Sequence, residues 1–197
     1  MWDERFAGED YMFGKEPAQA LTRHKGHLHK AGTTLAVADG EGRNSIYLAK
    51  QGFAVHAMDS SIVGIEKAQK LALDHEVAPT FELADIYDYD WHKQSYDNVV
   101  AIFIQFAPPE KWDSLFAGLK SALRPGGCLF LHGYTPKQVD YGTGGPSNPA
   151  HLYTTAMLGD AFADMDILVN EAYEAVLDEG PGHSGQSALI DFIAIKK

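Results

Sequence analysis

Cysteine is almost absent from this 197-residue chain, in which Cys128 is the only one. A single cysteine excludes an internal disulfide and suits a reducing compartment, so we expect the protein in the cytoplasm. Basic residues are also scarce, because 16 Lys and Arg stand against 27 Asp and Glu, which gives a net charge of −11. An acidic surface repels polyanions, so the composition argues against a nucleic-acid partner.

Long apolar runs and repeats are missing as well. The longest stretch without Asp, Glu, Lys or Arg covers residues 141–159, and its Gly, Pro, Ser and Thr make a poor membrane span. The first residues, MWDERFAGEDYMFG, are acidic and aromatic, whereas a signal peptide has a basic start and an apolar run. We therefore expect no membrane partner. The length and the 45% of apolar residues predict one domain with a sizeable core.

Apolar runs alternate with helical patterns from residue 33 onward, which is typical of a parallel sheet flanked by helices. The sequence therefore predicts an α/β fold: a Rossmann-like, seven-stranded, mostly parallel sheet with helices on both faces and an antiparallel last strand. We expect a single domain over 1–197, in which residues 1–30 form a cap or lid and residues 31–197 form the sheet core. The expected strands are 33–39, 53–59, 80–85, 96–106, 128–134, 167–177 and 188–195, and the expected helices are 42–52, one capped by Ser60 or Ser61, one opened by Pro108 and Pro109 and stopped by RPGG (124–127), and 154–164.

The turn after the first strand, ADGEGRNS (38–45), carries glycines where the backbone of an open α/β sheet approaches its ligand. Gly40 and Gly42 allow that approach. A dinucleotide fingerprint requires a third glycine where this chain has Ser45, which weakens an NAD interpretation. A tight turn without a ligand is the alternative for the glycine pair.

Carboxylates follow the first three expected strands. Asp59 lies 20 residues after Asp39, where a carboxylate can accept hydrogen bonds from both hydroxyls of a ribose. Asp85, beside the backbone N–H of Ile86, can read an adenine edge. The alternatives are a helix N-cap for Asp59 and a loop aspartate for Asp85, but three acidic strand ends in register favour an adenosine-containing ligand.

Four segments give the chain a resemblance to the class I S-adenosylmethionine-dependent methyltransferases. They are LAVADGEGRN (35–44), AMDSS (57–61), LADIYD (83–88) and LRPGG (123–127). This resemblance implies a seven-stranded sheet, S-adenosylmethionine as the cofactor and S-adenosylhomocysteine as the product. WDERFAGEDYMFGKEP (2–17), Gly-Arg-Asn at 42–44 and EGPGHSGQSALIDFIAIK (179–196) resemble more narrowly the tellurite-resistance and thiopurine methyltransferase group.

The resemblance also implies roles for single residues. The family motif differs in detail from Ala-Asp-Gly-Glu-Gly (38–42) of this chain. The implied cofactor contacts are Asp39, Gly40 and Gly42 around the methionine part, Asp59 and Ser60 at the ribose, Asp85 and Ile86 at the adenine, and Ile104 and Gln105 facing the amino-acid portion.

Methyl transfer from a sulfonium is an in-line displacement, so alignment of donor and acceptor can supply roughly 7–11 kcal/mol of the barrier without a protein nucleophile. An anionic sulfur, selenium or tellurium acceptor would neutralise the sulfonium along the reaction, and excluding water favours such a step. We therefore expect a small, soft acceptor. The aromatic segment Trp2, Phe6, Tyr11, Met12 and Phe13 is a candidate lid, with core packing as its alternative.

A protonated acceptor would also need a base or a contact that orients it. His183, in a glycine-rich loop, is the preferred candidate, ahead of His132, His151 and Tyr134, and Tyr11 is expected beside it. Arg43 can hold the carboxylate of the cofactor or an anionic substrate. The alternatives are an exposed loop histidine and a helix-surface arginine.

Other interpretations are weaker. His24, His27 and His29 lie among basic neighbours, so we expect no metal site. An NAD(P)-dependent reductase is disfavoured because this chain lacks a recognisable Tyr-x-x-x-Lys pair for hydride chemistry. A protein that binds the cofactor without turnover stays open, as do a monomer and a homodimer.

Overall fold

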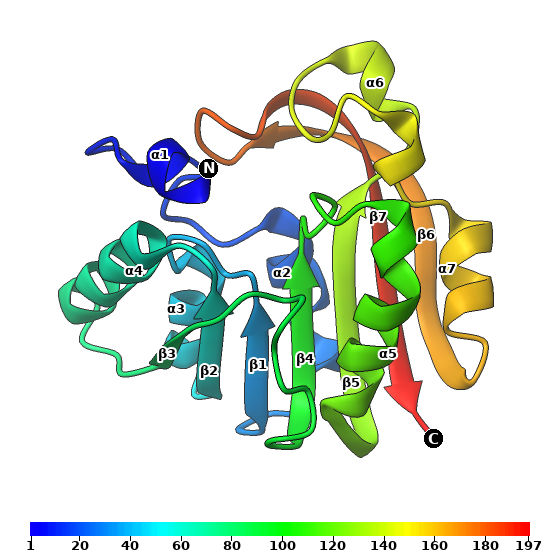
Figure 1. Cartoon of the computed structure of the whole chain (residues 1–197), viewed down its shortest axis with the longest axis horizontal. Coiled ribbons are helices and arrows are strands. Elements are labelled where there is room, and N and C mark those ends of the chain that lie inside the picture. The colour runs from blue at the N-terminus through cyan, green and yellow to red at the C-terminus, as the bar shows by residue number, and fades with distance from the viewer.

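Seven strands form one sheet in the order β3-β2-β1-β4-β5-β7-β6 in a computed structural model that describes residues 1–197 (Figure 1). Neighbours from β3 to β5 run parallel, whereas β7 runs antiparallel to both β5 and β6. The predicted fold class is confirmed. The strands are β1 (Thr33–Val37), β2 (Ala54–Asp59), β3 (Thr80–Leu83), β4 (Tyr96–Ile102), β5 (Leu123–Tyr134), β6 (Met165–Asp178) and β7 (Ser184–Lys196).

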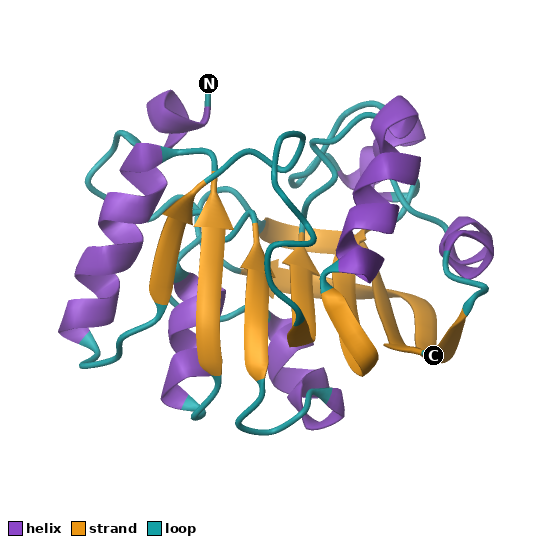
Figure 2. Ribbon diagram, turned by 60° about the horizontal axis from the view of Figure 1, so that its bottom comes forward, coloured by secondary structure: helices purple, strands orange, loops and turns teal.

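Helices flank both faces of the sheet (Figure 2). Helices α2 and α3 contribute to the core on one face, and α5 and α7 contribute to the core on the other. None of the helices combines the length and the apolar character that a membrane crossing requires. They are α1 (Trp2–Phe6), α2 (Gln19–His24), α3 (Arg43–Lys50), α4 (Ile62–Asp74), α5 (Trp112–Ser121), α6 (Gln138–Tyr141) and α7 (Thr155–Ala161), with 3-10 turns at Lys25–His27, Pro109–Lys111 and Pro149–His151.

The central strands are buried on both faces, as their continuous apolar runs predict. Side chains of a strand alternate between faces. In β4, Val99 and Ala101 therefore join the core beneath α5, whereas Val100 and Ile102 join the core beneath α2 and α3. Two separate apolar layers thus hold the strands rigidly, so their carboxyl ends keep fixed positions.

Three expected boundaries were wrong, and the first of these is the last strand, which begins at Ser184 rather than at residue 188. The fourth strand ends at Ile102 because Phe103 has a left-handed backbone with φ 56°. RPGG (124–127) lies inside β5 rather than before it: Leu123 pairs with Tyr96 and Cys128 with Asn98, so four residues bulge from the ladder opposite one.

The start of α4 follows the expected capping rule. Ser61, rather than Ser60, is the N-cap, and its side-chain oxygen accepts a hydrogen bond of 3.0 Å from the backbone N–H of Gly64. The preceding strand end, with Asp59, is thereby fixed in position.

The N-terminal segment and the β6–β7 turn lie over the carboxyl ends of β1, β2 and β4 (Figure 1). Gly182 N donates a hydrogen bond of 2.9 Å to Met12 O, which joins the two segments. Between them and the strand ends lies the space in which an open α/β sheet binds its ligand.

Candidate functional site

A cavity of about 490 Å³ opens at the carboxyl ends of the parallel strands. Its volume falls within the usual range of small-molecule sites. Asp59, the last residue of β2, and Asp39 and Asp85, which come two residues after β1 and β3, all line it, so the sheet brings the three predicted carboxylates together. The cavity wall also includes Gly40, Arg43, Ser60, Ile86, Gln105 and His183 from the predicted site, and Trp2, Arg5, Phe6, Phe13, Phe103, Phe106 and Tyr134.

Asp39 and Asp59 form the acidic side of the cavity. Asp39 accepts hydrogen bonds from the backbone N–H of Ser45, at 3.2 Å, and from its hydroxyl. Burial raises the pKa of Asp39 to about 7, despite these hydrogen bonds. Burial also raises the pKa of Asp59, although it accepts hydrogen bonds of 2.8 Å from the backbone N–H groups of Gly40 and Ser61. Neither carboxylate forms an ion pair with a protein cation, so this side of the cavity suits a positively charged ligand.

The two motif glycines have different tasks. Gly40 lines the cavity with φ 61°, and a Cβ there would lie 3.4 Å from the ring of Phe6. Gly42 does not line the cavity. A Cβ on Gly42 would lie 2.6 Å from Cβ of Ala68 and from Cδ1 of Ile46, so this glycine lets α3 and α4 pack closely. Gly42 therefore has a helix-packing role, and its expected cofactor contact stays a prediction.

Asp85 and Ile86 line the cavity just after the end of β3. Asp85 is exposed, and its Oδ1 accepts a hydrogen bond of 2.9 Å from the backbone N–H of Tyr87. Ile86 is buried and offers an apolar surface beside that carboxylate. A flat heterocycle with a polar edge suits this combination.

The end of β4 presents other side chains than expected. Ile104 is fully buried in the core, so its side chain does not line the cavity as expected. Phe103 takes that place because its left-handed backbone redirects the chain after Ile102. Gln105 lines the cavity, but its amide bonds to the backbone of Tyr134, accepting from N at 2.6 Å and donating to O at 2.8 Å. Its amide therefore joins the ends of β4 and β5.

His183 lies in an aromatic wall. Its ring centroid is 4.4 Å from that of Phe13 and 4.1 Å from that of Phe103. It is 6% exposed, and neither its Nδ1 nor the hydroxyl of Tyr134 has a hydrogen-bond partner. Burial, and next the charge of Arg43, lower the pKa of His183 to about 2. The alternative of an exposed loop histidine is wrong, and the neutral imidazole is a weak proton acceptor suited to a substrate contact.

Arg43 is more buried than a helix-surface arginine, whereas Tyr11 lies outside the cavity. Arg43 is 6% exposed rather than at the surface, and its Nη1 lies 2.8 Å from Oε2 of Glu179. Tyr11 does not line the cavity, because its hydroxyl donates a hydrogen bond of 3.0 Å to the carbonyl of Lys67 on α4. The expected place of Tyr11 beside His183 is taken by Phe13.

The three clustered histidines do not converge. Nε2 of His24 lies 2.9 Å from Asp191, and Nε2 of His29 lies 2.8 Å from the carbonyl of Gly126. No group of three or more His, Cys, Asp or Glu side chains is arranged to hold a metal ion. Of the other base candidates, His132 is buried against Asp191 and His151 lines the cavity.

Sequence reasoning missed Phe103 and Glu179. The place of Phe103 in the cavity wall depends on its own left-handed backbone, which no local sequence pattern predicts. Glu179 stands in a segment that the family resemblance covers, but its partner, Arg43, is far away in the sequence. Only the folding of the whole chain brings the two side chains together.

Comparisons with known proteins agree with this geometry. Residues 34–127 match a family model described as a methyltransferase domain, and this match covers the strands that carry Asp39, Asp59 and Asp85. It confirms the predicted methyltransferase class. No curated protein sequence matches the chain.

Solved structures share the fold at low sequence identity. One, from a study of the conversion of a disulfide bond into a thioacetal group during echinomycin biosynthesis, is 18% identical with a TM-score of 0.80, covering 100% of this chain and 91% of that one. TehB from Haemophilus influenzae is 19% identical with a TM-score of 0.71, and the match covers 90% of this chain and 61% of TehB. The third structure is the 1,6-didemethyltoxoflavin-N1-methyltransferase of Burkholderia thailandensis, solved with S-adenosylhomocysteine. It is 18% identical with a TM-score of 0.65, and the match covers 90% of this chain and 76% of that one.

Proposed function

We propose that this protein transfers a methyl group from S-adenosylmethionine to a small acceptor, with a soft sulfur, selenium or tellurium nucleophile preferred. One observation carries the proposal. The cavity holds two carboxylates, Asp39 and Asp59, whose pKa values are raised by burial and neither of which forms an ion pair with a protein cation. A sulfonium cofactor with an α-ammonium group and an adenosine tail supplies the missing positive charge.

The lining residues fit the parts of such a cofactor in chain order. Asp39 and Gly40 would hold the ammonium end, Asp59 and Ser60 the ribose hydroxyls, and Asp85 with Ile86 the adenine. Both oxygens of Asp59 already accept backbone N–H groups, which fixes the carboxylate while leaving lone pairs free for hydroxyl donors. When bound, the cofactor supplies an electrophilic methyl group.

The remaining residues orient the acceptor and exclude water. Phe13, Phe103 and His183 make one side of the cavity apolar, which favours a reaction that neutralises charge. Because the lowered pKa of His183 makes it a weak base, a nucleophile that arrives already deprotonated suits this wall. That property supports a thiolate, a selenide or a tellurium oxyanion ahead of an alcohol.

We also propose membership of the tellurite-resistance and thiopurine methyltransferase group. The N-terminal and C-terminal segments that resemble it meet over the cavity, where Met12 binds Gly182, and the fold resembles that of TehB. On this proposal the chain is a single domain, residues 1–30 are its cap, and the partner is a small molecule. The assembly would be a monomer or a homodimer.

Titration calorimetry with S-adenosylmethionine, S-adenosylhomocysteine and NADH tests the cofactor. Micromolar binding of the first two and none of NADH is the expected result, and the reverse would overturn the proposal in favour of a reductase. Formation of S-adenosylhomocysteine, followed by mass spectrometry over thiols, selenols, tellurite, alcohols and amines, tests the acceptor. Binding without turnover across the panel would indicate a cofactor-binding protein, and turnover of alcohols or amines alone would contradict the soft acceptor.

A further inference from the structure

Glu179 is a buried carboxylate at the start of the β6–β7 turn, and each of its oxygens has a polar neighbour. Oε2 lies 2.8 Å from Nη1 of Arg43 at the start of α3, and Oε1 accepts a hydrogen bond of 2.8 Å from the backbone N–H of Gln19 at the start of α2. Its side chain is 3% exposed. Glu179 therefore connects three segments that lie far apart in the sequence.

Arg43 depends on this carboxylate. A buried guanidinium without an anionic partner is strongly unfavourable. Glu179 is the one carboxylate that forms an ion pair with Arg43, with Oε2 at 2.8 Å from Nη1, and neither of these two atoms has a hydrogen-bond partner. A planar guanidinium carries five N–H donors, and since Arg43 lines the cavity, these donors are available to a ligand there.

The position of Arg43 indicates which ligand group these donors meet. Arg43 is the first residue of α3 and follows the turn of Asp39 and Gly40, where the proposed function puts the methionine part of the cofactor. That part carries one anionic group, its α-carboxylate. Arginine binds carboxylates through two parallel N–H groups, and a guanidinium held beside a buried carboxylate is pre-ordered for this geometry.

We propose that Glu179 is a positioning residue that holds Arg43 so that the guanidinium binds the α-carboxylate of the cofactor. The inference rests on the proposed function and adds to it a residue and a ligand group. Glu179 itself touches no ligand in this arrangement. It acts through Arg43.

The turn that carries Glu179 has backbone anchors of its own. Glu179 N donates a hydrogen bond of 2.9 Å to His183 O, and Gly182 N donates one of 2.9 Å to Met12 O. Removing the charge of the Glu179 side chain therefore leaves these anchors in place. A side-chain variant can then report on Arg43 without releasing the turn.

The test compares two ligands that differ in the amino-acid part. S-adenosylhomocysteine has the α-carboxylate, whereas 5′-methylthioadenosine lacks both the carboxylate and the ammonium. Glu179→Gln keeps the shape of the side chain and removes its charge. We expect it to lower the affinity for S-adenosylhomocysteine about tenfold, as for the loss of one charge-assisted contact. The affinity for methylthioadenosine should fall by no more than about twofold. Glu174→Gln, at an exposed carboxylate of β6, is the matched control and should change neither affinity.

Arg43→Gln should lower the affinity for S-adenosylhomocysteine at least as much as Glu179→Gln does. The double variant should lose no more affinity than Arg43→Gln alone, because the two residues act as a unit. Equal losses for the two ligands, or no loss in Glu179→Gln, would overturn the inference. Should Glu179→Gln fail to fold, Arg43→Lys keeps the charge but not the planar fork, and must still discriminate between the ligands. If the wild type binds S-adenosylhomocysteine and the variants do not discriminate, this inference alone fails. If the wild type binds neither ligand, the proposed function fails first.

Discussion

The Arg43 guanidinium and the Glu179 carboxylate meet at 2.8 Å and join the first turn of α3 to the turn between β6 and β7. The pair lies between the acidic side of the cavity, at Asp39, and its aromatic wall, at His183. The charge of Arg43 lowers the pKa values of both groups, after burial has raised that of Asp39 and lowered that of His183. One ion pair thus influences the proposed cofactor end and the proposed acceptor end together.

Asp39→Asn is expected to weaken S-adenosylmethionine at least about tenfold at pH 8, because it removes a charge that faces the cationic cofactor. Wild-type affinity should fall as the pH drops below about 7, since protonation neutralises Asp39. The uncharged methylthioadenosine is the control and should bind equally well to both proteins. Calorimetry between pH 6 and 8 measures both effects, and a flat wild-type profile would contradict the assignment.

The stability of the ligand-free protein should depend on the same group. Between pH 3.8 and about 7 the folded protein retains a proton on Asp39 that the unfolded chain has released. The free energy of unfolding therefore decreases as the pH rises through this window. Asp39→Asn should flatten that part of the profile in urea titrations. An unchanged profile would show that another group is responsible.

Gly42→Ala is expected to be more destabilising than Gly52→Ala. Both glycines have a left-handed backbone, with φ of 93° and 88°, so both alanines carry a similar conformational strain. The added methyl on Gly42 would lie 2.6 Å from Cβ of Ala68, whereas that on Gly52 meets nothing within 4 Å. We expect a difference of about 1–3 kcal/mol in the free energy of unfolding. Equal losses in urea titrations would show that α3 and α4 separate easily.

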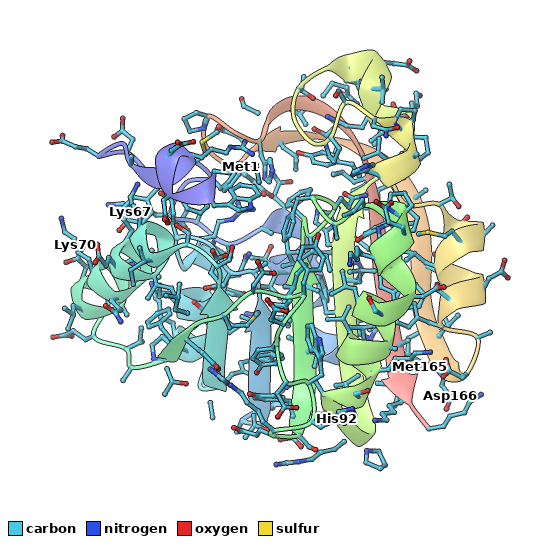
Figure 3. All side chains as sticks on the ribbon, in the orientation of Figure 1. Met1, Lys67, Lys70, His92, Met165 and Asp166 are labelled. Carbon is cyan, nitrogen blue, oxygen red and sulfur yellow. The ribbon has the colours of Figure 1, made fainter.

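Lys67→Met is expected to loosen the N-terminal segment, and Lys70→Met is not. Nζ of Lys67 donates to the carbonyls of Phe6, Gly8 and Asp10 at 3.1, 2.9 and 2.7 Å. Figure 3 shows Lys67 on α4 near α1 and Lys70 farther out on the same helix. Lys70 is exposed.

The expected readouts are faster hydrogen exchange over residues 2–14 and weaker cofactor binding by several-fold, because residues of this segment line the cavity. Unchanged exchange in Lys67→Met would mean that aromatic packing alone retains the segment. The same change in Lys70→Met would mean that the effect is not specific to those three hydrogen bonds.

Asp191→Asn is expected to cost about 1–3 kcal/mol of stability, because it removes the charge of a buried carboxylate that accepts a hydrogen bond from the buried His132 ring and pairs with the half-exposed Arg23. Asp191 is 1% exposed, is paired with Arg23, lies 2.9 Å from Nε2 of His24 and accepts a hydrogen bond of 2.7 Å from Nδ1 of His132. The matched control Asp164→Asn, at an exposed pair, should cost less than about 1 kcal/mol. Thermal unfolding of the two variants measures the difference.

The pH dependence of this site has the opposite sign to that of Asp39. Burial raises the pKa of Asp191, but the hydrogen bond and charge of His132, with the charges of Arg23 and His24, bring it below its ordinary 3.8. Its stabilisation is therefore present above pH 3.8 and is lost as the pH falls through the lowered pKa. Asp191→Asn should remove that acid-dependent loss, and a persistent loss would point to other carboxylates.

The pattern of apolar and polar residues along the sequence determined the fold class and the edge of the sheet at which the three carboxylates lie. The alternation of apolar runs and helical segments is sufficient for the fold class, because side-chain periodicity is a property of the chain itself. The same alternation predicts that Asp39, Asp59 and Asp85 meet at one edge, since parallel strands end on the same side of their sheet. The structure places all three at the cavity.

The tertiary structure alone decided which other side chains reach the cavity and in what state. Phe103 lines it and Ile104 does not because of a single left-handed residue, and Tyr11 is drawn away by a carbonyl of α4. The ion pair of Arg43 with Glu179 and the depressed pKa of His183 arise from burial among residues distant in sequence. Desolvation and long-range contacts depend on the whole packed chain, and no short segment encodes them.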